Sequence, residues 1–223
     1  MSFYRDHLTD VEKKIFDGAK QVFEALLDDF NSKDLLRKGT PTNQRERLSK
    51  MWRQSRLFGM AFNTTIKLFM DREKFVAFAN KNRDDGFNEQ IITDCLLNQY
   101  IGMFIYNVET VFRSSLLFFI KEEQGFRKRM ELGRLINAVK DISPQLGDDL
   151  EKLIDRELRN ALAHGAIWFE AGGKVFLADN SHLENPIELR LDEFMIRVKK
   201  QNIVAHAFIE TLMEKVDQGY FLG

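Results

Sequence analysis

Hydrophobic residues in the first part of the chain recur at every third or fourth position, a spacing that predicts amphipathic helices. The first helix should begin at Thr9-Asp10-Val11-Glu12, which has the form of a capping box, and end near Asn31. Its hydrophobic positions are Val11, Ile15, Ala19, Val22, Leu26 and Phe30. A second helix carries hydrophobic residues from Leu48 to Phe69, after a break at Gly39-Thr40-Pro41.

A long third helix is expected over residues 88–122, and its hydrophobic face contains a carboxylate, Glu109. The positions assigned to that face are Asn98, Gly102, Ile105, Glu109, Phe112 and Leu116. A charge among apolar residues is costly unless a partner compensates it, so an arginine should lie within reach. Arg113 is one helical turn away, and Arg159 or Arg156 could approach from another helix. A structural ion pair is favoured here over a catalytic carboxylate.

Two further helices are predicted in the next segment. Leu132-Gly133-Arg134-Leu135-Ile136 forms a brief one, and Ser143-Pro144 begins the next, with serine as N-cap and proline at the first helical position. This helix should extend over residues 143–164, because Gly165 after His164 is typical of a helix end. Its inward stripe is Leu150, Ile154, Leu158, Ala161 and Leu162.

Beyond the histidine the hydrophobic pattern changes from helical to alternating. Residues 166–178 predict a β-hairpin, whose turn at Ala171-Gly172-Gly173 uses glycines that tolerate positive φ. Ile187-Glu188-Leu189-Arg190 could add a third strand. Asp192 is then expected to cap a last helix that ends near Gly219. The chain is therefore predicted to be mainly α, with one small hairpin.

Polar side chains with useful chemistry share the outer face of the 143–164 helix. Asn160 and His164 are neighbours at i and i+4, Arg156 and Arg159 also point outward, and Arg159 lies about 140° around the helix from His164. A structural explanation is open as well: Arg159 could pair with Asp155, and His164 could cap the helix.

Arg159-Asn160-Ala161-Leu162-Ala163-His164 resembles the Arg-polar-x-x-x-His signature of HEPN domains. These are all-helical modules, and many are metal-independent endoribonucleases. The order of elements is also similar, with Glu109 and Arg113 on a long helix, then residues 132–136, then the motif. The resemblance covers about residues 88–217.

The resemblance implies an up-and-down helical bundle. We expect one domain over residues 1–223, in which residues 88–217 form the HEPN-like bundle, residues 1–85 form an N-terminal helical extension and the hairpin lies near 166–178.

Composition excludes some classes of protein. Cys95 is the single cysteine, so a disulfide framework and a cysteine-based zinc site are excluded, and a cytoplasmic location is expected. The most apolar stretch, residues 91–120, is interrupted by charged and amide side chains, so no membrane span is expected. The formal net charge is −1, which does not indicate a polyanionic partner.

Nucleic-acid binding would have to be local. A basic helix face extends from Arg45 to Arg56, and a short patch follows the third helix at Arg127, Lys128 and Arg129. Together with Arg156, the second patch is the candidate substrate-binding set. These side chains support RNA binding if they lie on the same side as the motif, whereas a solvated helix surface is the simpler explanation.

Cleavage of RNA without a metal needs a base for the 2′-hydroxyl proton, an acid for the leaving oxygen and cations for the phosphate. His164 at a helix C-terminus, where the dipole favours imidazolium, and Arg159 match these needs, and Asn160 could orient the ring or touch the substrate. No metal or cofactor is expected. Because one histidine cannot easily be both acid and base, a twofold homodimer would supply the second, an arrangement that the resemblance implies.

The leading hypothesis is a HEPN-type endoribonuclease that cleaves single-stranded RNA in RNA processing, stress response or toxin-like defence. The alternative is a non-catalytic interaction or dimerisation module of the same fold, with a nucleotidyltransferase or an antitoxin as partner. A plain helical scaffold is the third possibility.

Overall fold

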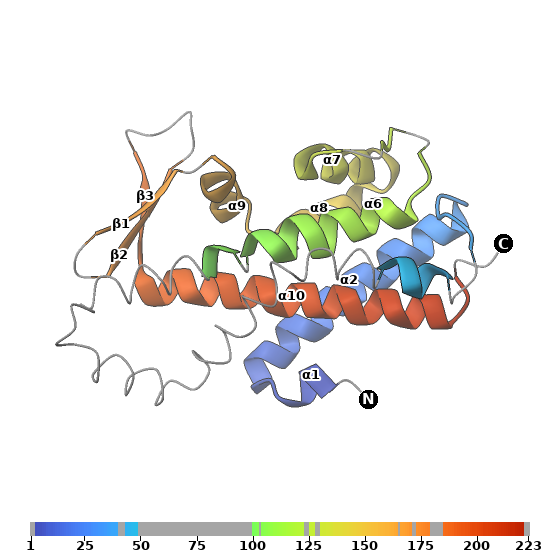
Figure 1. Cartoon of the computed structure of the whole chain (residues 1–223), viewed down its shortest axis with the longest axis horizontal. Coiled ribbons are helices and arrows are strands. Elements are labelled where there is room, and N and C mark those ends of the chain that lie inside the picture. The colour runs from blue at the N-terminus through green and yellow to red at the C-terminus, as the bar shows by residue number, and fades with distance from the viewer. Residues whose placement is uncertain are drawn as a thin grey trace.

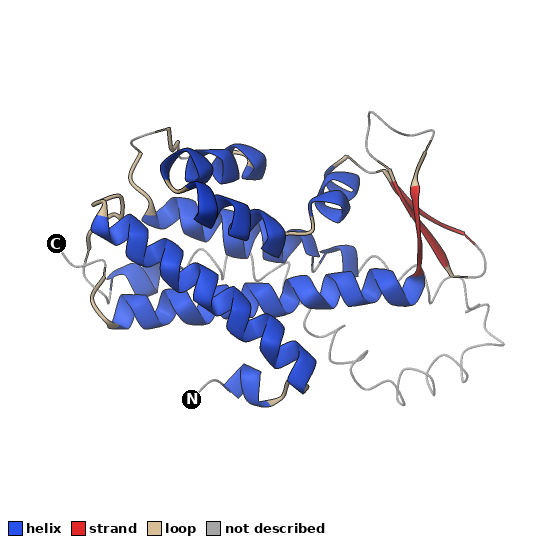
Figure 2. Cartoon of the chain, turned by 180° about the vertical axis from the view of Figure 1, so that it is seen from behind, coloured by secondary structure: helices blue, strands red, loops and turns tan. Residues whose placement is uncertain are grey.

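The structure is a computed structural model that describes residues 3–39, 43–48, 100–102, 104–122, 125–127, 130–164, 166–170, 173–178 and 185–220. In these ranges helices predominate, and one three-stranded antiparallel sheet lies at one end of the helical layer (Figures 1 and 2). The prediction of a mainly α chain is confirmed. Within the same ranges, none of the helices combines the length and the apolar character that crossing a bilayer requires.

Helices α2 (Asp10–Ser32) and α10 (Leu191–Asp217) pack along each other and form the centre of the fold (Figure 1). The expected capping box is present, because the backbone amide of Thr9 donates to the Glu12 carboxylate at 2.9 Å and the amide of Glu12 donates to the Thr9 hydroxyl. Phenylalanines fill the space between α2, α10 and their neighbours; the fully buried ones are Phe16, Phe23, Phe30, Phe104, Phe119, Phe194 and Phe208. Helix α2 is thus a core element.

The third helix differs from the expectation. Its described part is helical at residues 100–102 and 104–105, continues as a π-helical stretch, η2 (Tyr106–Ser114), and ends with α6 (Ser115–Phe119), before Glu122. Ile105, assigned to the inward face, is 40% exposed, whereas Asn107 is buried. The buried side chains, which are Phe104, Val108, Val111, Phe112 and Leu116, keep a spacing of three and four, so the inward face lies to one side of the expected face that contained Ile105 and Glu109. The expected start near residue 88 lies outside the described residues.

The helix expected over residues 143–164 is two helices, α8 (Pro144–Leu153) and α9 (Arg156–Ala163), preceded by α7 (Leu132–Ile142). The break falls at Ile154, and the carboxylate of Asp155 caps α9 by accepting from the backbone amide of Leu158 at 3.0 Å. The inward stripe is nevertheless buried as expected: Leu150, Ile154, Leu158, Ala161 and Leu162.

Ser143 does not cap α8 with its side chain, which corrects a second expectation. Its hydroxyl donates to the carboxylate of Asp29 and accepts from the ammonium of Lys33 at 2.7 Å, and both residues belong to the end of α2. A tertiary contact between α2 and the α7–α8 junction has taken the place of the local cap.

Three strands, β1 (Ile167–Glu170), β2 (Lys174–Leu177) and β3 (Ile187–Arg190), form the sheet in the order β1-β2-β3. This confirms the hairpin and the third strand, and Gly173 has the positive φ, +77°, that its turn requires. The N-cap of the last helix, α10, is Arg190 and not Asp192, two residues earlier than expected, and the backbone amide of Arg190 donates to the Glu193 carboxylate at 2.8 Å.

Candidate functional site

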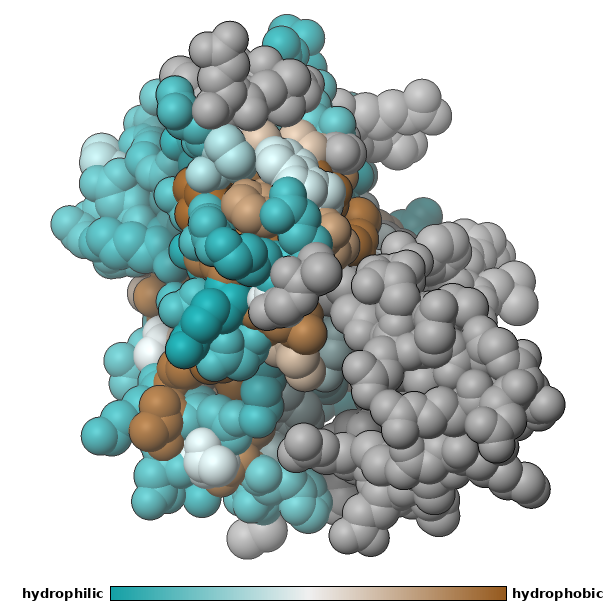
Figure 3. All heavy atoms as spheres, turned by 90° about the vertical axis from the view of Figure 1, so that its left-hand side faces the viewer, coloured by the Kyte–Doolittle hydropathy of each residue, from teal (hydrophilic) through white to brown (hydrophobic). Residues whose placement is uncertain are grey.

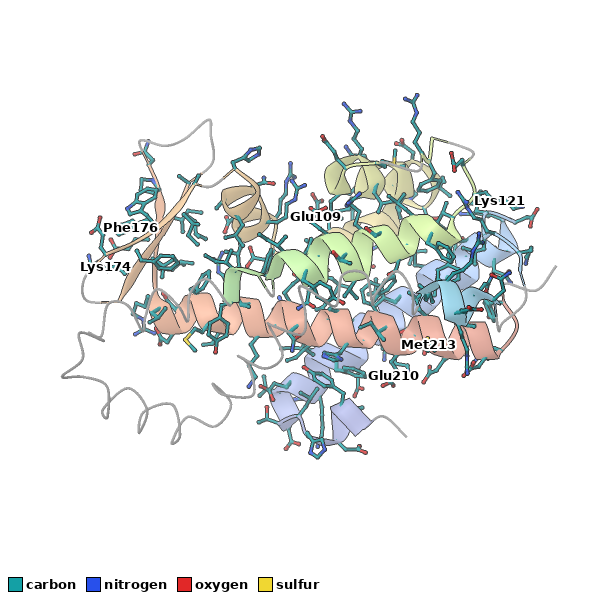
Figure 4. All side chains as sticks on the ribbon, viewed as in Figure 1. Glu109, Lys121, Lys174, Phe176, Glu210 and Met213 are labelled. Atoms are coloured by element: carbon teal, nitrogen blue, oxygen red, sulfur yellow. The ribbon has the colours of Figure 1, made fainter. Side chains whose placement is uncertain are left out.

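The motif helix α9 is joined to η2 by one carboxylate and two arginines. Nε and Nη2 of Arg159 donate to Oε1 of Glu109 at 3.2 and 3.1 Å. Nε of Arg113 donates to the other oxygen, Oε2, at 2.6 Å. The three side chains are 24–28% exposed, so the cluster is half-buried. The prediction that an arginine compensates Glu109 is confirmed, because both Arg113 and Arg159 form ion pairs with it. Glu109 is labelled in Figure 4.

The cluster continues on both sides. Nη1 of Arg113 donates to the backbone carbonyl of Met130 at 3.0 Å, which brings the segment before α7 beside the carboxylate. Nη1 of Arg159 donates to Oδ1 of Asn160 at 3.3 Å. The side-chain oxygen of Asn160 thus contacts the arginine of the motif.

Arg159 is held in one orientation but keeps donor capacity. A guanidinium has five N–H donors, and the contacts to Glu109 and Asn160 use three of them. The pairing with Asp155 that the helical spacing allowed is not formed. Asp155 instead caps α9 and lies 3.6 Å from Nη1 of Arg197 on α10. Two N–H groups of Arg159 therefore have no hydrogen-bond partner among the described residues and could bind a phosphate.

The π-helical stretch η2 is a structural feature of the site that the sequence did not predict. Glu109 lies in its first turn, and its backbone carbonyl accepts from the hydroxyl of Ser114 at 2.8 Å. Such local widening of a helix is frequently found at functional sites. The hydrophobic spacing alone did not indicate it, because Phe112 and Leu116 fit an ordinary α-helix equally well.

His164 lies at the end of α9, as expected. Its backbone amide donates to the carbonyl of Asn160 at 3.1 Å and closes the helix, and the residue is exposed. Its imidazole forms no hydrogen bond or ion pair with any residue that the structure describes. The two motif residues thus differ, because Arg159 is held against η2 whereas His164 faces solvent.

Of the four expected substrate-binding residues, the structure describes Arg156 and Arg127. Arg156 is 74% exposed beside the motif and donates to Glu151 at 3.0 Å. Arg127 is exposed in the segment that leads to Met130. Lys128 and Arg129 lie outside the described residues.

The longer basic helix face does not lie beside the motif in its described part. Arg45 pairs with Asp217 at the C-terminal end of α10, whereas α9 is tied to α10 near its beginning through Arg197. Twenty residues of helix separate these two points, which is about 30 Å. Arg47 lies over the ring of Phe118, 5.8 Å from its centroid. The remainder of that face, to Arg56, is outside the described residues.

Comparison with known protein families, with functionally characterised proteins and with solved structures gives no match to this chain. Among the described residues, no three histidine, cysteine, aspartate or glutamate side chains gather as a metal site would require. The function is therefore argued from the geometry of the motif.

Proposed function

We propose that this protein is a HEPN-type, metal-independent endoribonuclease that cleaves single-stranded RNA, acting in RNA processing, stress response or defence. The observation that supports it most is the arrangement on α9. His164 faces solvent at the C-terminal end of this short helix. Arg159 of the same helix is held in place by two hydrogen bonds to Glu109 of η2. A titratable group and a fixed cation on the same short helix supply two of the groups that phosphodiester transfer needs.

The reaction we propose is an internal transfer. The 2′-oxygen loses its proton to a base and attacks the adjacent phosphorus, and the bond from phosphorus to the 5′-oxygen breaks. An acid protonates that leaving oxygen, so the products are a 2′,3′-cyclic phosphate and a 5′-hydroxyl. His164 serves as base or acid, and the two remaining donors of Arg159 stabilise the charge on the phosphate oxygens.

The proposal includes a second protomer. One imidazole cannot accept and donate a proton in the same step, and His164 is the one histidine of the motif. A twofold axis beside α9 would bring the partner's copy of the motif into the same cleft. The exposure of the helix end is compatible with that approach.

A non-catalytic module of the same fold is the second candidate, and one observation favours it. Arg159, Arg156 and Arg45 are all paired with carboxylates of the same chain, and the formal net charge is −1. A surface of this kind attracts phosphate weakly over long distances. Such a module would assemble with itself, a nucleotidyltransferase or an antitoxin.

Incubation of the full chain with labelled single-stranded RNA and excess chelator tests the proposal. The wild-type protein should cut the RNA, and the 3′ ends should carry 2′,3′-cyclic phosphate. His164→Ala should lose at least about 100-fold in rate, because proton transfer contributes about 10²–10⁴-fold. Arg159→Ala should lose most of the activity as well. His7→Ala, which removes another exposed histidine, is the matched control.

Several results would reject the mechanism. These are cleavage that survives His164→Ala, cleavage that needs a divalent ion and products that lack the cyclic phosphate. A dimer that cuts no RNA under any of these conditions would favour the non-catalytic module.

A further inference from the structure

The outer face of the sheet carries a stacked pair of aromatic side chains. Trp168 of β1 lies opposite Phe176 of β2, with ring centroids 5.3 Å apart and planes inclined by 11°. Figure 4 shows Phe176 and Lys174 on the side of the sheet that points away from the helices. Figure 3 views the molecule from that end, where hydrophobic residues gather among hydrophilic ones. Trp168 is 37% exposed, so part of the indole is accessible to solvent.

The core does not require this pair. The sheet already buries its opposite face through Val175, Leu177 and Leu189. On that face Phe169 also rests on Phe194 of α10, with centroids 5.9 Å apart. A cross-strand aromatic pair stabilises a hairpin modestly, and smaller side chains would serve a purely structural purpose with less exposed apolar surface.

Phe176 stacks on one face of the indole. The strand order β1-β2-β3 places β1 at an edge of the sheet, with β2 on its inner side. Phe176 covers the indole face that points toward β2. The other face points toward the edge, and no aromatic ring of a described residue stacks on it. A flat aromatic ligand could therefore continue the stack.

The platform lies close to the motif along the chain. Trp168 follows His164 by four residues, so the two Cα atoms are at most about 14 Å apart. A base stacked on Trp168 and a phosphate beside His164 can consequently belong to the same short strand.

Charges on this face indicate what kind of nucleic acid fits. This face carries two cations, Lys174 and Arg190, and two anions, Glu170 and Glu188. The ammonium of Lys174 lies 2.7 Å from the carboxylate of Glu188, and both side chains are exposed. The hydrogen bond to Glu188 raises the pKa of Lys174, so this cation is already paired. Because the charges balance, stacking would dominate the binding. Unpaired bases offer their ring faces, whereas bases in a duplex are already stacked.

We infer that Trp168, backed by Phe176, is a stacking platform for one unpaired base of the RNA, next to the phosphate that is cleaved. This inference rests on the proposed function. It adds a substrate subsite to it, one that selects single-stranded RNA with little dependence on the identity of the base.

Binding of a fluorescein-labelled single-stranded RNA octamer tests the platform, measured by anisotropy in the full chain carrying His164→Ala so that the RNA stays intact. Trp168→Ala in that background should weaken binding roughly 5- to 150-fold, and Trp168→Phe should retain most of the affinity. Ile187→Ala, which removes another exposed hydrophobic residue from the far strand, should bind as the parent does.

Octamers with a single abasic position make the test specific. At one or two positions the abasic RNA should bind the parent more weakly, and there Trp168→Ala should cause no further loss.

The outcomes separate the two proposals. In one outcome the wild-type protein cuts RNA, but the variant with Trp168→Ala binds the octamer as tightly as the variant with Ile187→Ala. The stacking platform is then wrong, and the proposed function stands. If neither cleavage nor octamer binding is found, both fail. If Trp168→Ala converts a dimer to a monomer and leaves the affinity for the octamer unchanged, the face is a protein interface and the inference is overturned.

Discussion

Replacement of Glu109 by alanine should destabilise the fold, because it leaves two half-buried guanidinium groups without their shared carboxylate. Removing one partner of a fully buried ion pair costs about 3–5 kcal/mol, whereas an exposed pair contributes about 0–1 kcal/mol. With side chains that are 24–28% exposed, the cluster lies between these limits. We expect Glu109→Ala to lower the free energy of unfolding by about 2 kcal/mol.

The other members of the cluster should contribute less individually. Arg159→Ala leaves Glu109 paired with Arg113 at 2.6 Å, so a loss of about 1 kcal/mol is expected. The double variant should be less destabilised than the sum of the two single variants, because the contact between Glu109 and Arg159 is lost in each single variant and can be lost only once.

Urea unfolding followed by circular dichroism measures these values, and a thermal melt should show Glu109→Ala about 4–8 °C below wild type. Glu188→Ala is the matched control, since it breaks a carboxylate–lysine pair whose side chains are both 51% exposed. Its effect should stay below about 0.5 kcal/mol. If Glu109→Ala costs no more than this control, the cluster does not hold α9 against η2, and the assigned arrangement of the motif is wrong.

Three further predictions concern other parts of the fold. Gly147→Ala should lower the free energy of unfolding in urea by about 3 kcal/mol, because the added Cβ would lie 2.7 and 2.8 Å from backbone atoms of Lys140. Gly133→Ala is the control: its Cβ would lie in open space, so it should stabilise α7 by up to about 1 kcal/mol. Burial lowers the pKa of His206 from 6.5 to about 4, so the unfolded chain binds the extra proton as pH falls. Stability should therefore decrease by about 2 kcal/mol between pH 7 and pH 5, and a His206→Phe variant that keeps the same slope would contradict this. Asp155→Ala should cost about 1 kcal/mol through loss of the α9 cap, and Asp155→Asn should recover most of it if capping is the cause.

Local patterns determined much of the secondary structure. The start of α2 could be predicted from the sequence, because Thr9 and Glu12, which form its capping box, are three positions apart and hydrogen-bond to each other. The hairpin was readable because side chains alternate between the faces of a strand and because Gly173 can adopt positive φ. The end of α9 at His164 followed from the glycine after it. In each case the interacting groups are close in the chain.

The positions of the helix boundaries and faces in the middle of the chain depended on contacts between elements. Ser143 would cap α8 in an isolated helix, but the end of α2 supplies Asp29 and Lys33 as stronger partners. The expected 143–164 helix breaks at Ile154 and Asp155, and the Asp155 carboxylate caps α9 and also approaches Arg197 of α10. Helix propensity and hydrophobic spacing depend on neighbouring residues, so they do not reveal partners that are far away in the sequence.

The same division applies to the candidate site. The sequence by itself determined that Glu109 needs a cation and that His164 ends a helix on its polar side. The tertiary structure decided that both Arg113 and Arg159 meet the carboxylate, and that Arg45 is tied to the opposite end of α10. An unpaired charge is costly wherever it is buried, so the need for a partner is visible in one helix. The choice of partner depends on how the helices pack, which only the folded chain defines.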